Sequence, residues 1–189
     1  MALSKIDAAN FLDGTLPDTN INNASLDNVT GLPAGVGGKV LQVLSTSKSS
    51  VSSITTNSDT FVDVTGMSVA ITPSSTSSKI LVQASVFYSL ADNTYGSLCG
   101  LRIARDTTAI GTGGQDYSSG TIVGHDDTSS LFFATVPLLF LDSPSTTSAK
   151  TYKIQVKNSI GGSKTFYVNG RKDGTNYGSS TITVMEIGA

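Results

Sequence analysis

Apolar and polar residues alternate with a period of two along several short segments of this chain. In residues 150–157, Tyr152, Ile154 and Val156 fall on one side, whereas Lys153, Gln155 and Lys157 fall on the other. Residues 79–88 alternate in the same way. Because successive side chains of a β-strand point to opposite faces, the pattern predicts strands with one face in a core and the other facing solvent.

Further apolar runs are separated by turn signals along the same part of the chain. They occupy residues 39–44, 61–64, 67–71, 98–104, 131–141, 164–168 and 180–187. A Ser/Thr-rich bridge is expected over residues 45–60, and no convincing helix follows residue 10. About eight strands in such an order predict an all-β fold, an antiparallel β-sandwich of the jelly-roll type.

The composition favours the same fold. Charged residues make up 14% of the chain, against about 25% in ordinary globular proteins. Ser and Thr supply roughly a quarter of the residues, far above their usual share. Thr and Val fit a pleated, half-buried surface, and Ser and Gly fill turns.

Residues 1–38 differ from the rest of the chain. They are rich in Asn, Asp, Leu and Gly, and they show no sustained alternation. Residues 4–9 could form one helical turn capped by Ser4. The segment is predicted to be a mostly extended arm ending in a glycine-rich hinge, and residues 39–189 are predicted to form the sandwich domain.

Several classes of partner and compartment are disfavoured. The 12 Lys and Arg residues are spread singly in a chain of net charge −2, which does not suit nucleic acid or a polybasic membrane anchor. The N-terminus lacks a signal-peptide pattern, and the apolar run 131–141 is too short for a membrane helix. We therefore expect a chain made in the cytoplasm, with no membrane insertion. The single Cys99 is expected to be a small core residue.

Residues 131–141 are apolar on both faces of the predicted strand. The strand is either buried on both sides, or its outer face meets another subunit. Pro137 cannot donate a hydrogen bond to a neighbouring strand, so an edge or a bulge is expected there.

No catalytic, metal or cofactor site stands out. The only imidazole, His125, is followed by Asp126 and Asp127, and these residues are expected in a solvated loop rather than in a Ser-His-Asp arrangement. With Asp116 they could offer oxygen ligands to Ca²⁺, but the spacing matches no calcium-binding loop. We expect no enzymatic activity, no metal and no cofactor.

Four stretches resemble a domain common in phage tail-fibre and other virion proteins: residues 38–43, 61–69, 71–82 and 180–187. The opening of the chain, residues 1–6 followed by Gly14-Thr15-Leu16-Pro17, looks like the start of many such fibre proteins. The resemblance implies a jelly-roll head similar to those of the complement and tumour-necrosis-factor superfamily. It also implies a homotrimer.

A function follows from this resemblance. The chain is expected to be a virion protein made in the host cytoplasm, whose residues 1–38 attach it to other virion proteins on the tail or the capsid. Two alternatives stay open: a capsid-decorating protein with no receptor role, and a secreted carbohydrate-binding module.

Host recognition, by a surface glycan or protein, is expected in loops at one end of the sandwich. The predicted contact residues are Tyr95, Tyr117, His125, Asp126, Asp127, Arg171 and Tyr177. Tyrosine offers a large amphipathic contact surface, and arginine can hold carboxylate or phosphate groups with two hydrogen bonds.

Overall fold

The structure is a computed structural model that describes residues 40–56, 60–90, 97–114, 122–125, 132–158, 163–171 and 173–188. All of these belong to one compact unit, Gly38–Ala189. The predicted arm and the helical turn expected over residues 4–9 lie outside the described residues.

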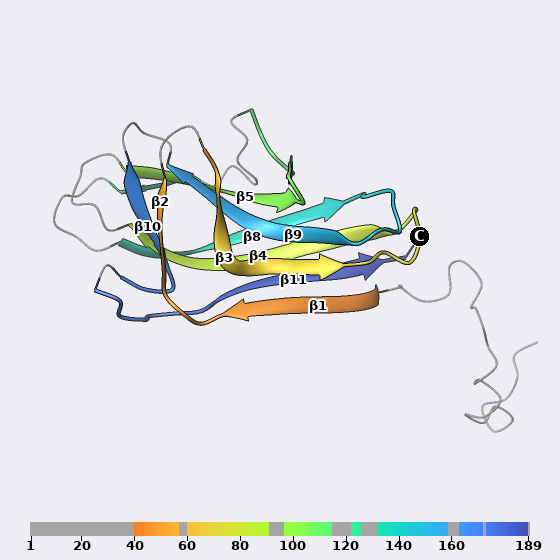
Figure 1. The fold of residues 1–189 in the computed structure, drawn as a ribbon, viewed down its shortest axis with the longest axis horizontal. Coiled ribbons are helices and arrows are strands. Elements are labelled where there is room, and N and C mark those ends of the chain that lie inside the picture. The colour runs from red at the N-terminus through yellow and green to blue at the C-terminus, as the bar shows by residue number, and fades with distance from the viewer. Residues whose placement is uncertain are drawn as a thin grey trace, which may run out of the picture. The chain divides into compact units, whose positions relative to one another are not determined.

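The described residues form two antiparallel sheets (Figure 1). Sheet A has the order β1-β11-β4-β10-β2, and β8 pairs with the other side of β4. Its strands are β1 (Val40–Lys48), β2 (Ser52–Thr56), β4 (Lys79–Leu90), β8 (Phe132–Asp142), β10 (Lys164–Val168) and β11 (Ser180–Ile187).

Sheet B has the order β3-β9-β5-β6, and β7 also pairs with β5. Its strands are β3 (Val62–Ile71), β5 (Ser97–Arg105), β6 (Thr108–Ile110), β7 (Ile122–His125) and β9 (Lys150–Asn158). The chain crosses between the sheets from β2 to β3, from β3 to β4, from β4 to β5, from β7 to β8, from β8 to β9 and from β9 to β10. These crossings confirm the predicted jelly-roll sandwich.

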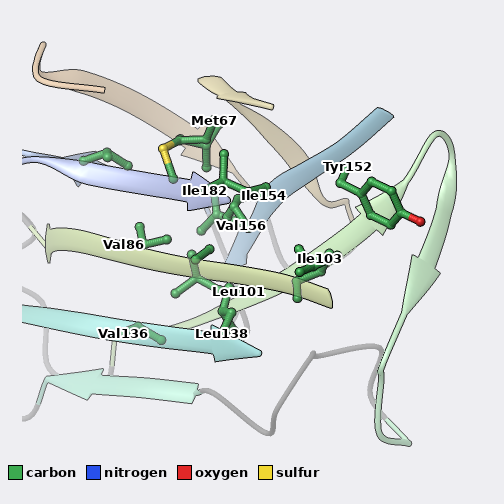
Figure 2. Packing of buried hydrophobic residues seen from close by; sticks show 14 of the residues in the cluster. Met67, Val86, Leu101, Ile103, Val136, Leu138, Tyr152, Ile154, Val156 and Ile182 are labelled. Atoms are coloured by element: carbon green, nitrogen blue, oxygen red, sulfur yellow. The ribbon is translucent and has the colours of Figure 1, made fainter. Parts of the chain in front are cut away.

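The core lies between the sheets and comes from the inward positions of the alternating strands. Tyr152, Ile154 and Val156 are fully buried, as the alternation predicts. They belong to one cluster with side chains of sheet A such as Val86 and Leu138, and Figure 2 shows Ile154 and Val156 near the centre of this cluster. Cys99 is also buried in this core, so its predicted role as a small core residue is confirmed.

Two local predictions need correction. The expected bridge over residues 45–60 is wrong for most of its length, because β1 continues to Lys48 and β2 pairs with β10 along Ser52–Thr56. The two runs 61–64 and 67–71 form one strand, β3, whose register shifts around Gly66 at a φ of +81°. Glycine adopts this conformation without strain, which suits a bulge.

The sandwich has two ends that matter for function. Val40, Ile187 and Lys79 lie together at one end, here called the entry end, where the preceding residues join the domain. Lys48 and Ser180 pair at the opposite end of β1, and we call this the loop end. At the usual rise per residue, the nine residues of β1 separate the two ends by roughly 27 Å.

Candidate functional site

The connection between β10 and β11 is built on Asn169 at the loop end. The side chain is fully buried, and the backbone is left-handed, with a φ of +65°. Its Nδ2 donates to the carbonyl oxygen of Lys48 at 2.7 Å, and its Oδ1 accepts from the Ser180 hydroxyl at 2.6 Å. Its backbone amide donates to the Phe87 carbonyl at 3.0 Å. Asn169 thus joins strands β1, β4 and β11 at one point.

The residues after Asn169 turn back on themselves. The Arg171 amide donates to the Thr175 carbonyl at 3.1 Å, and the Gly174 amide donates to the Arg171 carbonyl at 3.0 Å. Asp173 Oδ1 accepts from the Thr175 amide at 2.9 Å. Gly174 has a φ of +81°, a conformation that side chains rarely adopt. The loop is therefore held by its own hydrogen bonds.

Arg171 and Tyr177 come together on this loop. Arg171 Nη1 donates to the Tyr177 hydroxyl oxygen at 3.2 Å, and the guanidinium carbon lies 5.9 Å from the ring centroid. Arg171 also forms an ion pair with Asp173, with 3.6 Å between Nη2 and Oδ2. Tyr177 is 51% exposed, so the pair presents an aromatic ring and a cation at the surface.

A short row of aromatic rings supports Tyr177. The Tyr177 ring packs on Phe133 at 5.2 Å between centroids, and Phe133 stacks on Phe87 at 5.9 Å. Gly178 fits closely here, because an added Cβ would lie 2.8 Å from the Phe87 ring. These contacts fix the position of Tyr177 on the surface of the domain.

The other predicted contact residues are less completely described. Tyr95, Tyr117, Asp126 and Asp127 lie outside the described residues, and only the backbone of His125 is described. His125 is the last residue of β7 and pairs with Ser97, so its predicted placement in a loop is wrong. The β-branched pair Ile122-Val123 favours a strand beside β5.

A second cluster surrounds Glu186 at the entry end. Its Oε1 accepts hydrogen bonds from the Ser74 amide and the Ser74 hydroxyl, both at 2.7 Å. Its Oε2 accepts from Gln42 Nε2 at 2.6 Å, and Gln42 Nε2 also donates to the Thr72 carbonyl at 2.8 Å. The carboxylate is fully buried.

These hydrogen bonds decide the charge state of Glu186. Burial alone would raise the pKa of the carboxyl group, but the donors Ser74 and Gln42 lower the pKa to about 2. The group is therefore an anion at neutral pH. It ties β1 and the turn after β3 to β11, and this role is structural.

Sequence reasoning did not single out Glu186, although a signal was present. In residues 180–187 the inward positions hold Ser180, Ile182, Val184 and Glu186. A carboxylate on the inward side of a strand needs partners in the core. The partners themselves could not be read from the sequence, because Ser74 and Gln42 are far away along the chain.

A third cluster joins the two sheets through Asp142 of β8. Its Oδ2 accepts from Arg105 Nη1 at 2.6 Å and from the Tyr152 hydroxyl at 2.7 Å. Arg105 and Tyr152 both belong to sheet B. Burial and the neighbouring Asp142 raise the pKa of Tyr152, so its hydroxyl remains a donor.

The outer face of sheet B carries a charged cluster. The centroid of the Phe61 ring lies 3.7 Å from the Arg102 guanidinium carbon and 4.7 Å from Lys157 Nζ. Gln155 accepts from Arg102 at 2.7 Å and donates to Asp63 at 2.6 Å. Gln155 was expected to face solvent, but it is buried, because these neighbouring side chains cover it on the outer face.

The described residues also bear on metal binding and on membrane insertion. Within them, no group of three or more His, Cys, Asp or Glu side chains could hold a metal ion. The described part of the chain also contains no helix that is long and apolar enough to cross a membrane.

Comparison with known proteins gives structural likeness alone. No protein-family model and no curated protein matches the chain. A chain in the structure of infectious bursal disease virus, Gx strain, is 12% identical with a TM-score of 0.40, covering 77% of this chain and 40% of that one. The VP2 subviral particle of the same virus gives 10% identity and a TM-score of 0.35, covering 77% and 38%.

Latent PorU from Porphyromonas gingivalis is similar too, at 7% identity and a TM-score of 0.35, covering 81% of this chain and 14% of that one. The chain thus spans less than half the length of each of these proteins. At such identities and TM-scores, the likeness does not bear on function.

Proposed function

We propose that this chain is a non-enzymatic structural protein of a bacteriophage particle. It forms a short, trimeric, fibre-like appendage on the tail or capsid surface. Residues 1–38 bind other virion proteins, and the jelly-roll domain projects from the particle. The protein uses no metal and no cofactor in this role.

The proposal rests on the positions in the fold of the four stretches that resemble phage virion proteins. Residues 40–43 of the first stretch begin β1, residues 62–69 of the second form most of β3, residues 71–82 join β3 to β4, and residues 180–187 are β11. The strands β1, β11 and β4 are neighbours in sheet A. The Glu186 carboxylate binds Gln42 and Ser74, so three of the four stretches meet at one buried anion.

The buried carboxylate of Glu186 gives three of these stretches a physical reason to occur in the same chain. A buried carboxylate is stable only if its donors are placed correctly, and its donors come from two other stretches. A chance likeness between Ser/Thr-rich segments would not require their side chains to complete one network. The network therefore supports the resemblance as one of fold as well as of composition.

The two ends of the sandwich suit an attached appendage. The predicted arm joins at Val40, whereas the loop that carries Arg171 and Tyr177 begins at the other end of β1, beside Lys48. We propose that the loop end contributes to host attachment through a surface glycan or protein.

Deleting residues 1–38 tests the proposal. The truncated chain should fold, because the core described above lies entirely beyond residue 40, but it should no longer join phage particles. Both the truncated chain and the full-length control are expressed from a plasmid during infection by a phage that lacks its own copy of the gene. Normal incorporation of the truncated chain would overturn the role of the arm.

A further inference from the structure

Four apolar side chains lie in register across the outer face of sheet A. Leu141 of β8 lies opposite Leu81 of β4, Leu81 lies opposite Met185 of β11, and Met185 lies opposite Val43 of β1. The neighbouring positions Ile80, Val82 and Val184 are fully buried in the core, so this row faces outward. Val43 is 54% exposed and Leu141 is 47% exposed.

The row ends in an apolar edge on each side. At one edge, β1 exposes Val40, Leu41, Val43 and Leu44, although Val43 and Leu44 point to opposite faces of the strand. At the other edge, β8 exposes Leu139 and Leu141. Because the row is in register, the two edges lie at the same height along the sandwich.

The outer face of sheet A carries almost no charge on its described residues. On the described residues of this face in β1, β4, β8 and β11, Lys79 at the rim is the one charged side chain. Most positions beyond the row carry small or amide groups, such as Ser45, Ser47, Gln83, Ser85, Thr181 and Thr183. The outer face of sheet B instead carries Arg102, Lys153, Lys157 and Asp63.

We propose that the β1 edge of one copy packs against the β8 edge of the next copy, so that the copies close into a ring. The inference rests on the proposed oligomer and names the surface that forms it. An uncharged surface accepts a copy of itself without repulsion, and removing exposed apolar side chains from water favours the contact. Two different edges at equal height make a head-to-tail contact that a rotation can close.

The first experiment disrupts each edge in the full-length protein. Val43→Asp and Leu141→Asp should each convert the oligomer to single chains in light scattering at micromolar concentration. The control is Thr65→Asp, which places the same charge at an exposed position of β3 in sheet B and should leave the mass unchanged. Circular dichroism and the melting temperature check that each variant is folded.

The second experiment identifies which edges meet. Val43→Cys and Leu141→Cys chains, carrying different tags, are mixed, reassembled and treated with a short bis-maleimide. The native Cys99 is buried and serves as the unreactive background. We expect a cross-linked pair of one Val43→Cys chain and one Leu141→Cys chain, and at least tenfold less product when either variant is treated alone.

The outcomes separate this inference from the proposed function. Efficient cross-linking of Val43→Cys to itself would indicate a two-fold contact and overturn the head-to-tail ring. An oligomer that resists both Asp variants and gives no mixed cross-link would overturn the interface while leaving the proposed function in place. A wild-type protein that is monomeric at all concentrations tested would overturn both.

Discussion

Glu186 Oε1 accepts two hydrogen bonds from Ser74, one from its amide and one from its hydroxyl, across 112 residues of sequence. Ser74 lies in the turn between β3 and β4, and Glu186 lies in the last strand of the domain. The contact therefore closes the fold by joining its last strand to an early turn. It also places the buried charge of the entry end next to the point where the preceding chain joins.

Glu186 should make the free energy of unfolding of the domain depend on pH in the acidic range. Its pKa is lowered from an ordinary value of 4.5 to about 2, so its contribution is complete above about pH 4.5 and is lost as the pH falls to 2. The contribution amounts to about 3 kcal/mol at full ionisation. Urea unfolding of the wild type and of Glu186→Gln should show a difference in free energy that shrinks over this range.

Asp173→Asn is the matched control, because Asp173 is a well-exposed carboxylate on the loop. It should leave the free energy of unfolding nearly unchanged, because an ion pair in solvent contributes little. If Glu186→Gln is as stable as the wild type at pH 7, the carboxylate network does not stabilise the fold.

Asp142 should stabilise the packing of the two sheets. Replacing it with Asn removes the acceptor charge that binds Arg105 and the Tyr152 hydroxyl, and we expect a loss of about 2–3 kcal/mol. Tyr152→Phe removes one of the two hydrogen bonds and should cost about 1 kcal/mol. Chemical denaturation measures both, and equal losses for the two variants would contradict a central role for the Asp142 charge.

Asn169 should hold the loop end through its backbone as well as its side chain. Asn169→Ala removes the hydrogen bonds to Lys48 and Ser180 and also strains the left-handed backbone, with an expected loss of about 3 kcal/mol. Asn169→Gly removes the same hydrogen bonds but relieves the strain, so it should be less destabilising by about 1 kcal/mol. Equal melting temperatures for the two variants would contradict the backbone part of this prediction.

The strands that pack into the core could largely be predicted from the sequence. In residues 79–88 and 150–157 the alternation corresponds to burial, because each inward side chain enters the space between the sheets. The short strands β2, β6 and β7 were missed. Ser52–Thr56 contains one buried apolar residue, Ile54, so its strand conformation depends on pairing with β10 rather than on its own pattern.

The clusters depend on contacts that local sequence does not encode. Arg171 and Tyr177 are close in sequence, and their placement in one loop could be predicted. The supporting rings Phe87 and Phe133 could not, because they join the loop only when β4 and β8 pair. The same holds for Gln155, whose outward position in β9 is covered by Arg102 of β5 and Asp63 of β3.

The loop end should be needed for adsorption to the host. We expect phage carrying Tyr95→Ala, Arg171→Ala and Tyr177→Ala together to assemble normally but to adsorb at least tenfold more slowly. The triple variant removes the exposed ring of Tyr177 and its cation while leaving Asn169 to hold the loop. Unchanged adsorption would remove the receptor role and leave a purely architectural protein.

We propose that this chain is a structural part of a phage particle, and the composition of purified particles is the direct test. Purified particles of the phage that encodes the chain would be imaged, and the mass per particle would give its copy number. We expect the chain in every particle at a fixed copy number that is a multiple of three, with a visible projection at the tail or capsid. Purified infectious particles that contain none of the chain would contradict it.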